Sequence, residues 1–359
     1  MPKEMAKDDP VSVAIVDDSR SVRRWLRAVL NADDRLEVVA EAGSGLEARD
    51  LLLKTKVDVM TLDINMPGMT GIEFLEKLMI HRPMPVVMLS ALTEEGSREA
   101  VEALSLGAVD CIEKPRAAVE GELLKEMRDR IWQAAQSHVS PQQHRQIHKT
   151  SRRTRPEPVP WNGPVILLGA STGGVAALES VLVELEGNPA PVIIAQHMPE
   201  NFLRSFGRRL NELFSRRCKM ADEGMLLQEN HAILCTGRTF STRLARKSNG
   251  DPYCTFGLPS ESAKYHPNID DMLLSAAGIG MCGCAAVLTG MGTDGANGLL
   301  ACRQAGFETW AQDEQTSVVY GMPKAAAELS AADQIAAPSE IGASINRTIM
   351  QLLNTGSAK

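Results

Sequence analysis

Short apolar runs alternate with amphipathic stretches along the first 136 residues. The apolar runs have the length of buried strands, and the stretches between them repeat apolar residues at helical spacing, as Val22, Leu26, Val29 and Leu30 do. Five such strand–helix units predict a parallel sheet covered on both faces. The predicted strands are 11–18, 37–42, 57–63, 85–91 and 109–115, and the predicted helices are 21–31, 46–54, 72–80, 98–108 and 119–136.

A second pattern of this kind begins at residue 164. The run PVILL (164–168) predicts a strand that leads into GASTGG and then into a helix. Further strands are predicted at 190–199 and 284–289, and a glycine-rich loop and a helix follow the second of these. The pattern predicts another α/β domain built on a doubly wound parallel sheet, of the Rossmann-like type.

The segment between the two patterns is polar and basic. It reads SHVSPQQHRQIHKTSRRTRPEPVP, with four prolines, five basic residues and one acid. So few apolar side chains cannot offset the entropy of ordering the chain. We therefore predict a first domain at 1–136, a flexible basic linker at 137–160 and a second domain at 161–359. The basic run is either a solvated tether or a docking segment for an acidic partner or for the acidic first domain.

Composition and charge are ordinary for a soluble globular protein. Of 359 residues, 44% are apolar and 23% charged, and the net charge of −7 argues against a surface that holds nucleic acid. There is no apolar run of about 18 residues, so no membrane span or insertion is expected. The polar N-terminus, Met1–Pro10, lacks the apolar region of a signal peptide. Seven cysteines without CxxC spacing predict reduced thiols in a cytoplasmic protein.

Polar side chains gather where the strands of the first domain end. Asp17 and Asp18 follow the first strand, Asp63 the third, Ser90 the fourth and Lys114 the fifth. Groups at the carboxyl ends of parallel strands collect at one edge of the sheet. Three carboxylates there need a cation, and their hard oxygens favour Mg²⁺. Asp63 is the candidate acceptor of a phosphoryl group, Lys114 its electrostatic contact and Ser90 its hydrogen-bond partner. Helix capping would explain one acid, but not five such residues.

These residues resemble the response-regulator receiver domains. The resemblance rests on the DD pair, the DINMPG run and the KP pair, and it covers residues 10–136. It implies a flavodoxin-like (βα)₅ fold, phosphorylation of Asp63 by a histidine kinase, and Mg²⁺ held by Asp18, Asp63 and the Asn65 carbonyl. The chain departs from the family three residues before the lysine, where receivers usually carry an aromatic residue and this chain has Cys111.

The second domain carries a candidate nucleophile. GASTG fits the G-x-S-x-G pattern of a nucleophile elbow, with Ser171 on the turn. The same glycines could cradle a phosphate, but they are spaced GxxxGG and not GxGxxG. Two further residues favour the elbow, because His197 ends a later strand and Asp294 lies in the loop after another. A hydroxyl, a base and a carboxylate at the ends of one sheet are what acyl transfer requires.

The chain order of these three residues is serine, histidine, acid. An α/β-hydrolase runs serine, acid, histidine, so a different fold is expected. His266 is the competing base, whereas His231 lies in an apolar context and is interpreted as structural. Taken alone, Asp294 could instead cap the helix that starts near Ala296.

The loop TGMGTDGANG (289–298) contains four glycines. Such a backbone approaches a substrate closely and aims N–H groups at an oxyanion. The Met291 N–H is the candidate donor, and Thr172, beside the nucleophile, is a second polar contact. No metal or cofactor is expected in an acyl-transfer step of this kind.

The second domain resembles the chemotaxis methylesterases, the family called CheB. The resemblance rests on GASTGG, QHMPENFLRSFGRRL, LTGMGTDGANGL and AQDEQTSVVYGMPKAA, and with the receiver it covers nearly the whole chain. It implies hydrolysis of glutamate γ-methyl esters on chemoreceptor cytoplasmic domains, and often glutamine deamidation. It also implies that Ser171 is the nucleophile, His197 the base and Asp294 the orienting acid. Two stretches depart from the usual family pattern, NHAILCTGRTFSTRL (230–244) and YHPNIDDML (265–273).

Two other classes of protein fit the sequence less well. A non-catalytic adaptor gated by the receiver would not need serine, histidine and aspartate at three strand ends. A DNA-binding response regulator would need a helix-turn-helix with a basic recognition helix, and the second domain instead has a sheet pattern. The sequence therefore predicts a phosphorylation-controlled serine esterase, with chemoreceptors as substrates and a histidine kinase as phosphodonor.

Overall fold

The chain forms two compact units, residues 1–144 and 145–359. The computed structural model describes residues 9–90, 93–114, 121–137, 139, 159–237, 239–260 and 265–356. Several predictions fall partly outside these ranges: the polar N-terminus, the end of the fourth strand, Pro115, the start of the helix at 119–136, and most of the linker at 137–160. Among the described residues, no helix combines the length and apolar character that crossing a bilayer requires.

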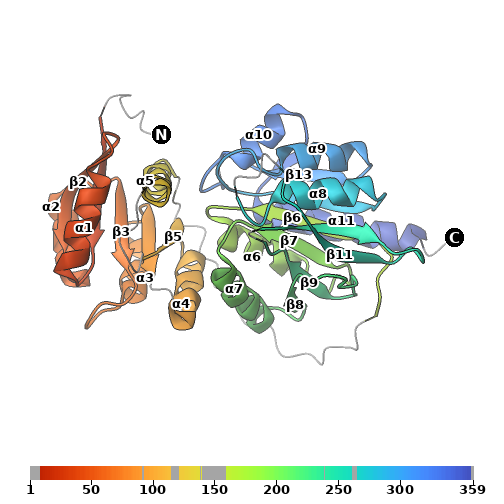
Figure 1. Ribbon diagram of the computed structural model, residues 1–359, viewed down its shortest axis with the longest axis horizontal. Coiled ribbons are helices and arrows are strands. Elements are labelled where there is room, and N and C mark those ends of the chain that lie inside the picture. Colours follow the sequence, from red (N-terminus) through yellow and green to blue (C-terminus); the bar gives the residue numbers. More distant parts are fainter. Residues whose placement is uncertain are drawn as a thin grey trace. The chain divides into compact units, whose positions relative to one another are not determined.

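The first unit is the predicted parallel sheet of five strands (Figure 1). It consists of β1 (Val11–Val16), α1 (Arg20–Leu30), β2 (Leu36–Ala42), α2 (Gly45–Lys54), β3 (Val59–Asp63), α3 (Gly71–His81), β4 (Val86–Ser90), α4 (Glu94–Ser105), β5 (Asp110–Glu113) and α5 (Glu122–Ala135). The order β2-β1-β3-β4-β5, with every pair parallel, confirms the flavodoxin-like prediction. Because parallel crossovers are right-handed, α1 and α5 cover one face and α2, α3 and α4 the other.

The second unit is a larger parallel sheet with one added hairpin. It consists of β6 (Val165–Ala170), α6 (Gly174–Glu184), β7 (Val192–Gln196), α7 (Glu200–Leu213), β8 (Arg217–Met220), β9 (His231–Leu234), β10 (Ser241–Arg246), β11 (Pro252–Gly257), α8 (Ile269–Gly278), β12 (Gly283–Val287), α9 (Ala296–Gln304), β13 (Glu308–Gln312), α10 (Met322–Glu328), β14 (Gln334–Ala336) and α11 (Pro338–Gly356). Seven strands follow the order β14-β13-β12-β6-β7-β9-β8, all in parallel pairs. The antiparallel pair β10–β11 was not predicted.

The strand order reverses between β6 and β12. From β6 the chain continues to β7 on one side, and only later returns to place β12 on the other side. Gly283 pairs with Val165 and Val287 with Gly169, so the two strands are in register along their length. In open α/β sheets, such a switch point opens a crevice at the carboxyl ends of the strands. The loops after β6, β7 and β12 all begin at this edge.

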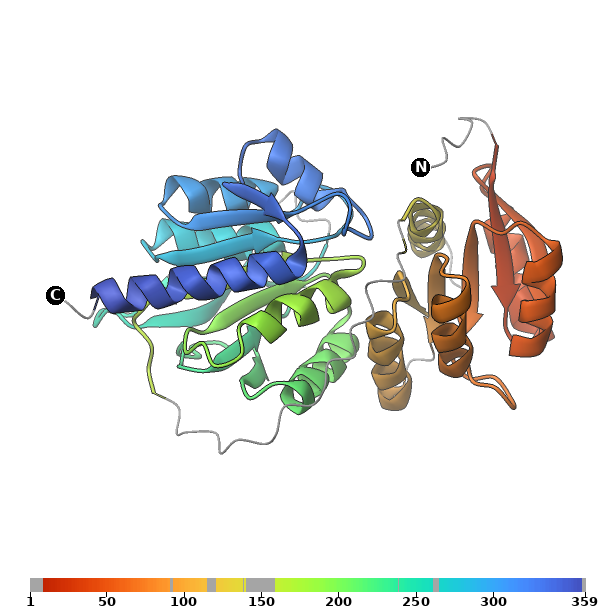
Figure 2. The ribbon, with the colours of Figure 1, turned by 180° about the vertical axis from the view of Figure 1, so that it is seen from behind.

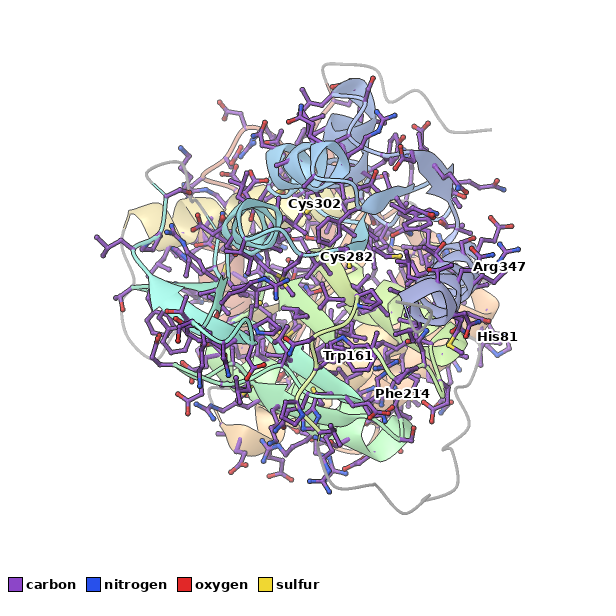
Figure 3. All side chains as sticks on the ribbon, turned by 90° about the vertical axis from the view of Figure 1, so that its right-hand side faces the viewer. His81, Trp161, Phe214, Cys282, Cys302 and Arg347 are labelled. Atoms are coloured by element: carbon purple, nitrogen blue, oxygen red, sulfur yellow. The ribbon has the colours of Figure 1, made fainter. Side chains whose placement is uncertain are left out.

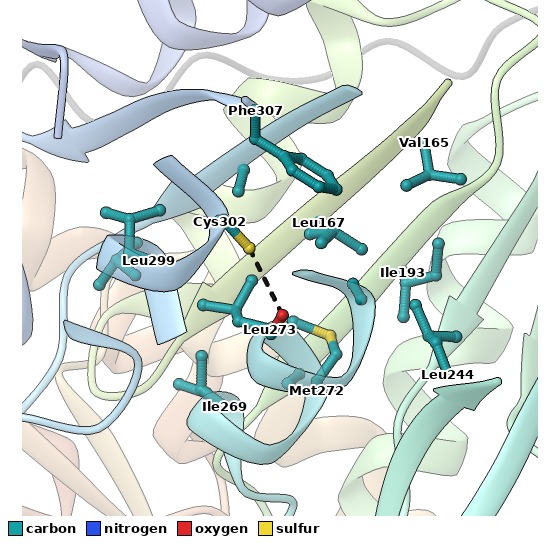
Figure 4. Close-up of a cluster of buried hydrophobic side chains, with 14 of the residues drawn as sticks. Val165, Leu167, Ile193, Leu244, Ile269, Met272, Leu273, Leu299, Cys302 and Phe307 are labelled. Atoms are coloured by element: carbon teal, nitrogen blue, oxygen red, sulfur yellow. Dashed lines mark hydrogen bonds between the residues drawn. The ribbon is translucent and has the colours of Figure 1, made fainter. Parts of the chain in front are cut away.

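Helices cover both faces of the second sheet. On one face α11 lies beside α6, as Figure 2 shows, and on the other α8 packs beside α9 (Figure 1). Beneath α8 and α9, apolar side chains of the sheet and helices interdigitate in a single core, which includes Leu167, Ile193, Leu273 and Phe307 (Figure 4). Cys302 is fully buried in this core and donates its thiol hydrogen to the Leu273 carbonyl over 3.5 Å.

The described part of the second unit begins at the last two residues of the predicted linker, 159 and 160. Pro160 forms an antiparallel bridge with Gln228, and the Val159 carbonyl accepts a hydrogen bond from the Glu229 amide. Trp161, labelled in Figure 3, then packs on the core and donates its indole N–H to the Pro164 carbonyl over 2.9 Å. These contacts fix the entry of the chain into β6.

Arg216 is a buried cation that stabilises the turn between α6 and β7. Its guanidinium donates to the carbonyls of Leu185, Asn188 and Ala190 over 3.0, 2.5 and 2.6 Å. Leu185 is the C-cap of α6, where the helix dipole places partial negative charge. Burial lowers the pKa of Arg216 to about 10, against the opposing charge of Glu186.

Replacing Arg216 with methionine is expected to lower the free energy of unfolding by about 3 kcal/mol, because three buried carbonyls lose their donor. Urea denaturation measures the change. The matched control is Arg49→Met, since Arg49 is exposed and pairs with its neighbour Asp50. A surface substitution of this kind changes stability by about 0.5 kcal/mol or less. Equal effects of the two variants would show that Arg216 does not stabilise the turn.

Candidate active site

The structure places the three predicted catalytic residues at neighbouring strand ends. Ser171 directly follows β6, His197 directly follows β7, and Asp294 lies in the loop after β12. The backbone joins these ends, because the Ser171 amide donates to the Thr289 carbonyl over 3.0 Å and the His197 amide donates to the Ala170 carbonyl over 3.0 Å. The switch point of the sheet therefore carries the predicted set.

His197 and Asp294 form a hydrogen-bonded pair. Nε2 of His197 lies 2.8 Å from Oδ2 of Asp294, and both side chains are less than a tenth exposed. Nδ1 of His197 is also buried and has no hydrogen-bond partner among the described residues. With its proton on Nε2 and directed at Asp294, the neutral ring keeps a lone pair on Nδ1 for accepting another proton.

Asp294 is held by the start of α8 as well as by His197. Its Oδ2 accepts a hydrogen bond from the Ile269 amide and its Oδ1 one from the Asp270 amide, both over 2.9 Å. Burial alone would raise the pKa of Asp294. The hydrogen bond and charge of His197 and the two amides outweigh burial, so the pKa lies below its ordinary value. The cap of α9 is Gly295, so Asp294 does not serve as the cap considered from its sequence position.

Glycines shape the turn that carries Ser171. Gly173 has a left-handed φ of 76°, and a Cβ there would lie 2.5 Å from Cβ of Val318. A Cβ on Gly290 would lie 2.5 Å from Cβ of Ser171, so only glycine lets this loop pass behind the predicted nucleophile. Thr172 is tied to the same loop, because Oγ1 of Thr289 donates to its carbonyl over 3.0 Å.

The glycine-rich loop leaves the amides of Met291, Gly292, Thr293 and Asp294 without an acceptor among the described residues. Among the described residues, the Met291 N–H donates to no backbone or side-chain acceptor, whereas the neighbouring Gly290 N–H donates to the Val319 carbonyl. The Gly290 carbonyl accepts from the Met322 amide over 2.8 Å, which fixes the peptide next to Met291. A half-buried, unpaired amide in a fixed loop is suited to binding an oxyanion.

Gln196 is a residue of this site that sequence analysis missed. It ends β7 and is 2% exposed. Its Nε2 donates to the carbonyls of Ser171, over 2.8 Å, and His197, over 3.2 Å. Its Oε1 faces Gly174, where a Cβ would collide with it. The side-chain amide of Gln196 thus links the turn that carries Ser171 to the end of β7, where His197 follows. The available signal was a polar residue ending the otherwise apolar strand VIIAQ.

Two further histidines in the described part of the second unit, His231 and His266, make different contacts. His231 is buried, and its Nδ1 is 2.9 Å from the Glu229 carbonyl. Burial lowers the pKa of His231, so the neutral form is favoured, which agrees with a structural residue. His266 precedes Pro267 through a cis peptide bond, and its buried Nδ1 has no partner in the described part of the chain.

The first unit brings its predicted acids together. Carboxylate oxygens of Asp17, Asp18 and Asp63 lie within 4.8 Å of one another. Nζ of Lys114 is 2.7 Å from Oδ2 of Asp17 and 2.8 Å from Oδ1 of Asp63. Asp17 and Asp63 are buried and Asp18 is exposed, so the cluster is open on one side. Three oxygen ligands with an open side fit a Mg²⁺ ion that also binds a phosphate.

The surroundings of Asp63 disfavour the ionised form of its carboxyl group. Burial raises the pKa of Asp63, and the ion pair with Lys114 only partly offsets that effect. The Asn65 amide donates to Oδ1 of Asp63 over 3.3 Å. The Ser90 hydroxyl is fully buried and donates to the Gly96 carbonyl in α4 over 2.8 Å, so it connects β4 with the start of that helix. Cys111 is buried in β5, and burial raises the pKa of its thiol.

Comparison with known proteins agrees with both units. Residues 13–127 match the family model of the response regulator receiver domain, so the chain is a response regulator. Residues 166–345 match the model of the CheB methylesterase, and the chain belongs to the CheB methylesterase family. This confirms the resemblance drawn from the sequence motifs.

The relatives align over nearly the whole chain. A protein of Agrobacterium fabrum, named protein-glutamate methylesterase/protein-glutamine glutaminase, is 40% identical over 93% of this chain and 95% of its own length. A Pseudomonas aeruginosa protein with the same name and the number 2 is 39% identical over 94% of this chain and 96% of its own. Among solved structures, the Thermotoga maritima CheB methylesterase catalytic domain is 28% identical, with a TM-score of 0.48, over 52% of this chain and 98% of its own.

The lowered pKa of Asp294 predicts how the site responds to acid. Asp294→Asn is expected to lower the free energy of unfolding by about 1–3 kcal/mol at neutral pH, because an amide nitrogen would face a donor. Since the folded pKa lies below the ordinary 3.8, this difference is fully present above pH 3.8 and shrinks as the pH falls through the folded pKa. Urea denaturation between pH 3 and 7 measures it.

The control for this series is Asp34→Asn, at an exposed position. A difference between wild type and Asp294→Asn that stays constant across the whole pH range would contradict the assigned contacts of Asp294.

Proposed function

We propose that the chain is a serine esterase that hydrolyses glutamate γ-methyl esters on the cytoplasmic domains of chemoreceptors and deamidates glutamines there, under control of its receiver domain. The observation that carries the proposal is the His197–Asp294 pair beside Ser171, at the switch point of a sheet in a CheB-family chain. The relatives' names supply the class of substrate.

In the proposed mechanism, Oγ of Ser171 attacks the γ-carbonyl carbon of the substrate glutamate. Nδ1 of His197 takes the hydroxyl proton, because Nε2 is directed at Asp294. The negative charge of Asp294 stabilises the imidazolium that forms. The carbonyl oxygen becomes an oxyanion, which accepts a hydrogen bond from the Met291 N–H. Thr172, beside the nucleophile, is the second polar contact.

Collapse of the tetrahedral intermediate breaks the ester bond. The imidazolium gives its proton to the leaving oxygen, so methanol departs and Ser171 keeps the acyl group. Water then attacks this ester, with His197 again taking a proton, and the free glutamate carboxylate and Ser171 hydroxyl are restored. With a glutamine side chain, the same steps release ammonia in place of methanol. All of the required groups belong to the chain itself.

The receiver controls this activity through Asp63. We propose that Asp63 accepts a phosphoryl group from a histidine kinase and that Lys114 and Ser90 contact the phosphate. Asp17, Asp18, Asp63 and the Asn65 carbonyl are suited to hold Mg²⁺, which would neutralise charge on the phosphoryl group. The contact of Ser90 with Gly96 supports a link from the phosphate to α4, since a hydroxyl turned toward a phosphate would release this carbonyl.

Ser171→Ala is expected to lower the rate of methanol release from methylated receptor at least about 10³-fold, because the hydroxyl that would attack the substrate is removed. The wild type should also be labelled by a fluorophosphonate at Ser171, and the variant should not. Ser21→Ala, at an exposed position of α1, is the control and should keep the wild-type rate. A Ser171→Ala variant as fast as the wild type would refute the proposed nucleophile.

Asp63→Asn is expected to abolish stimulation by a phosphodonor, because an amide cannot accept the phosphoryl group as a carboxylate does. Methanol release is measured with and without a small acyl phosphate and magnesium. The unstimulated rate should stay the same, and Asp50→Asn, on the exposed side of α2, should respond as the wild type does. Stimulation that survives in Asp63→Asn would show that control runs through another residue.

A further inference from the structure

Tyr265 lies against the predicted base. Its ring stacks on the imidazole of His197, with the ring centroids 5.1 Å apart and the planes inclined by 27°. The tyrosine is half-buried, while the His197 side chain is only 6% exposed. The residue belongs to YHPNIDDML, one of the stretches that departs from the usual family pattern, and no role has so far been given to it.

The tyrosine ring also reaches the glycine-rich loop. A Cβ on Gly292 would lie 3.8 Å from Cε2 of Tyr265, which is ordinary van der Waals contact. Gly292 is next to Met291, the candidate oxyanion donor. The ring therefore lies in contact with the base and close to the loop that carries this donor.

The same short segment holds the acid of the site. Four and five residues after Tyr265, the amides of Ile269 and Asp270 bind the carboxylate of Asp294. Residues 265–270 thus contact His197 through an aromatic ring and Asp294 through backbone N–H groups. This arrangement fixes the relative positions of the base and its partner from one piece of chain.

One hydrogen bond leaves the imidazole incompletely oriented. The bond from Nε2 to Asp294 fixes one corner of the ring, but a single hydrogen bond does not by itself fix the plane of the ring. Transfer of the Ser171 proton requires Nδ1, on the other side of the ring, to stay aligned with the serine hydroxyl. A flat partner stacked on the ring face opposes this tilt.

We infer that Tyr265 is a positioning residue, whose ring holds the imidazole of His197 in the plane needed to take the Ser171 proton. The inference rests on the proposed esterase function. Stacking also favours the reaction itself, because the imidazolium formed during attack lies over the electron-rich face of the tyrosine ring. The ring shields that face of the imidazole from water. Tyr265 acts through His197 and takes no part in bond making.

The test compares two substitutions in the full chain. Tyr265→Leu removes the flat ring, and Tyr265→Phe keeps it. Tyr253→Leu, in β11, is the matched control, because it removes a tyrosine ring that lies near Lys247 and not at the active site. Three quantities are measured: kcat and KM for methanol release from methylated receptor, the rate constant of fluorophosphonate labelling of Ser171, and the melting temperature.

Tyr265→Leu is expected to lower kcat and the labelling rate constant about tenfold each, which corresponds to about 1.4 kcal/mol of transition-state stabilisation. KM should change less than twofold. Tyr265→Phe should stay within about threefold of the wild type in both rates, and Tyr253→Leu should match the wild type. If Tyr265→Leu fails to fold, Tyr265→Met, with a flexible side chain, replaces it in the same comparison.

Two results would overturn the inference. If labelling is unchanged while KM rises, the ring contacts the substrate and does not position His197. If Tyr265→Phe is as slow as Tyr265→Leu, the hydroxyl matters and the stacked ring does not. Failure of the esterase proposal is seen separately, because the wild type itself would then release no methanol.

Discussion

The catalytic unit depends on one hydrogen bond, from Nε2 of His197 to Oδ2 of Asp294. This bond joins the loop after β7 to the loop after β12, across the central strand β6 that carries Ser171. A buried carboxylate is costly unless it is well bonded, and the two amides at the start of α8 supply the remaining bonds. The left-handed Gly173, the Gln196 side-chain amide and the close passage of Gly290 then place Ser171, the proposed nucleophile, relative to this fixed pair.

Each unit places its charged groups at the carboxyl edge of its own parallel sheet, but the pKa of the central carboxylate is shifted in opposite directions. In the receiver, three carboxylates meet with Lys114, and burial raises the pKa of Asp63. In the methylesterase unit, a single carboxylate is charge-stabilised by a helix start and by His197, which lowers its pKa. The first arrangement calls for a cation and a phosphate to balance its charge, whereas the second needs no further ion. A common architecture therefore hosts a regulated modification in one unit and a proposed hydrolytic site in the other.

The sheets and most residues of the two sites could be predicted from the sequence, because a strand of a parallel sheet is an apolar run and its end is marked by the polar residues that follow. That rule found Asp17, Asp63 and Lys114, and it placed Ser171, His197 and Asp294 at one edge. It could not find contacts that depend on how distant loops meet. The amides of Ile269 and Asp270 lie 25 and 24 residues before Asp294. Every residue except proline has a backbone N–H, so the sequence does not show which amides bind the carboxylate. Tyr265 was equally hidden, since stacking follows from packing and not from periodicity, whereas Gln196 could have been found as the polar residue that ends the apolar strand VIIAQ. The β10–β11 hairpin was missed because its strands, STRLAR and PYCTFG, are only partly buried and contain no continuous apolar run.

The position of β12 has a consequence for synthesis of the chain. β6 is made early, yet its neighbour on one side is β12, whose Gly283 pairs with Val165 at the start of β6. While the ribosome is still producing the intervening segment, that edge of β6 has no partner and is open to pairing with another chain. Asp294 follows β12, so a chain made only as far as this strand lacks the hydrogen-bond partner of His197. The contact that holds His197 to Asp294 therefore forms only after the centre of the sheet has been completed.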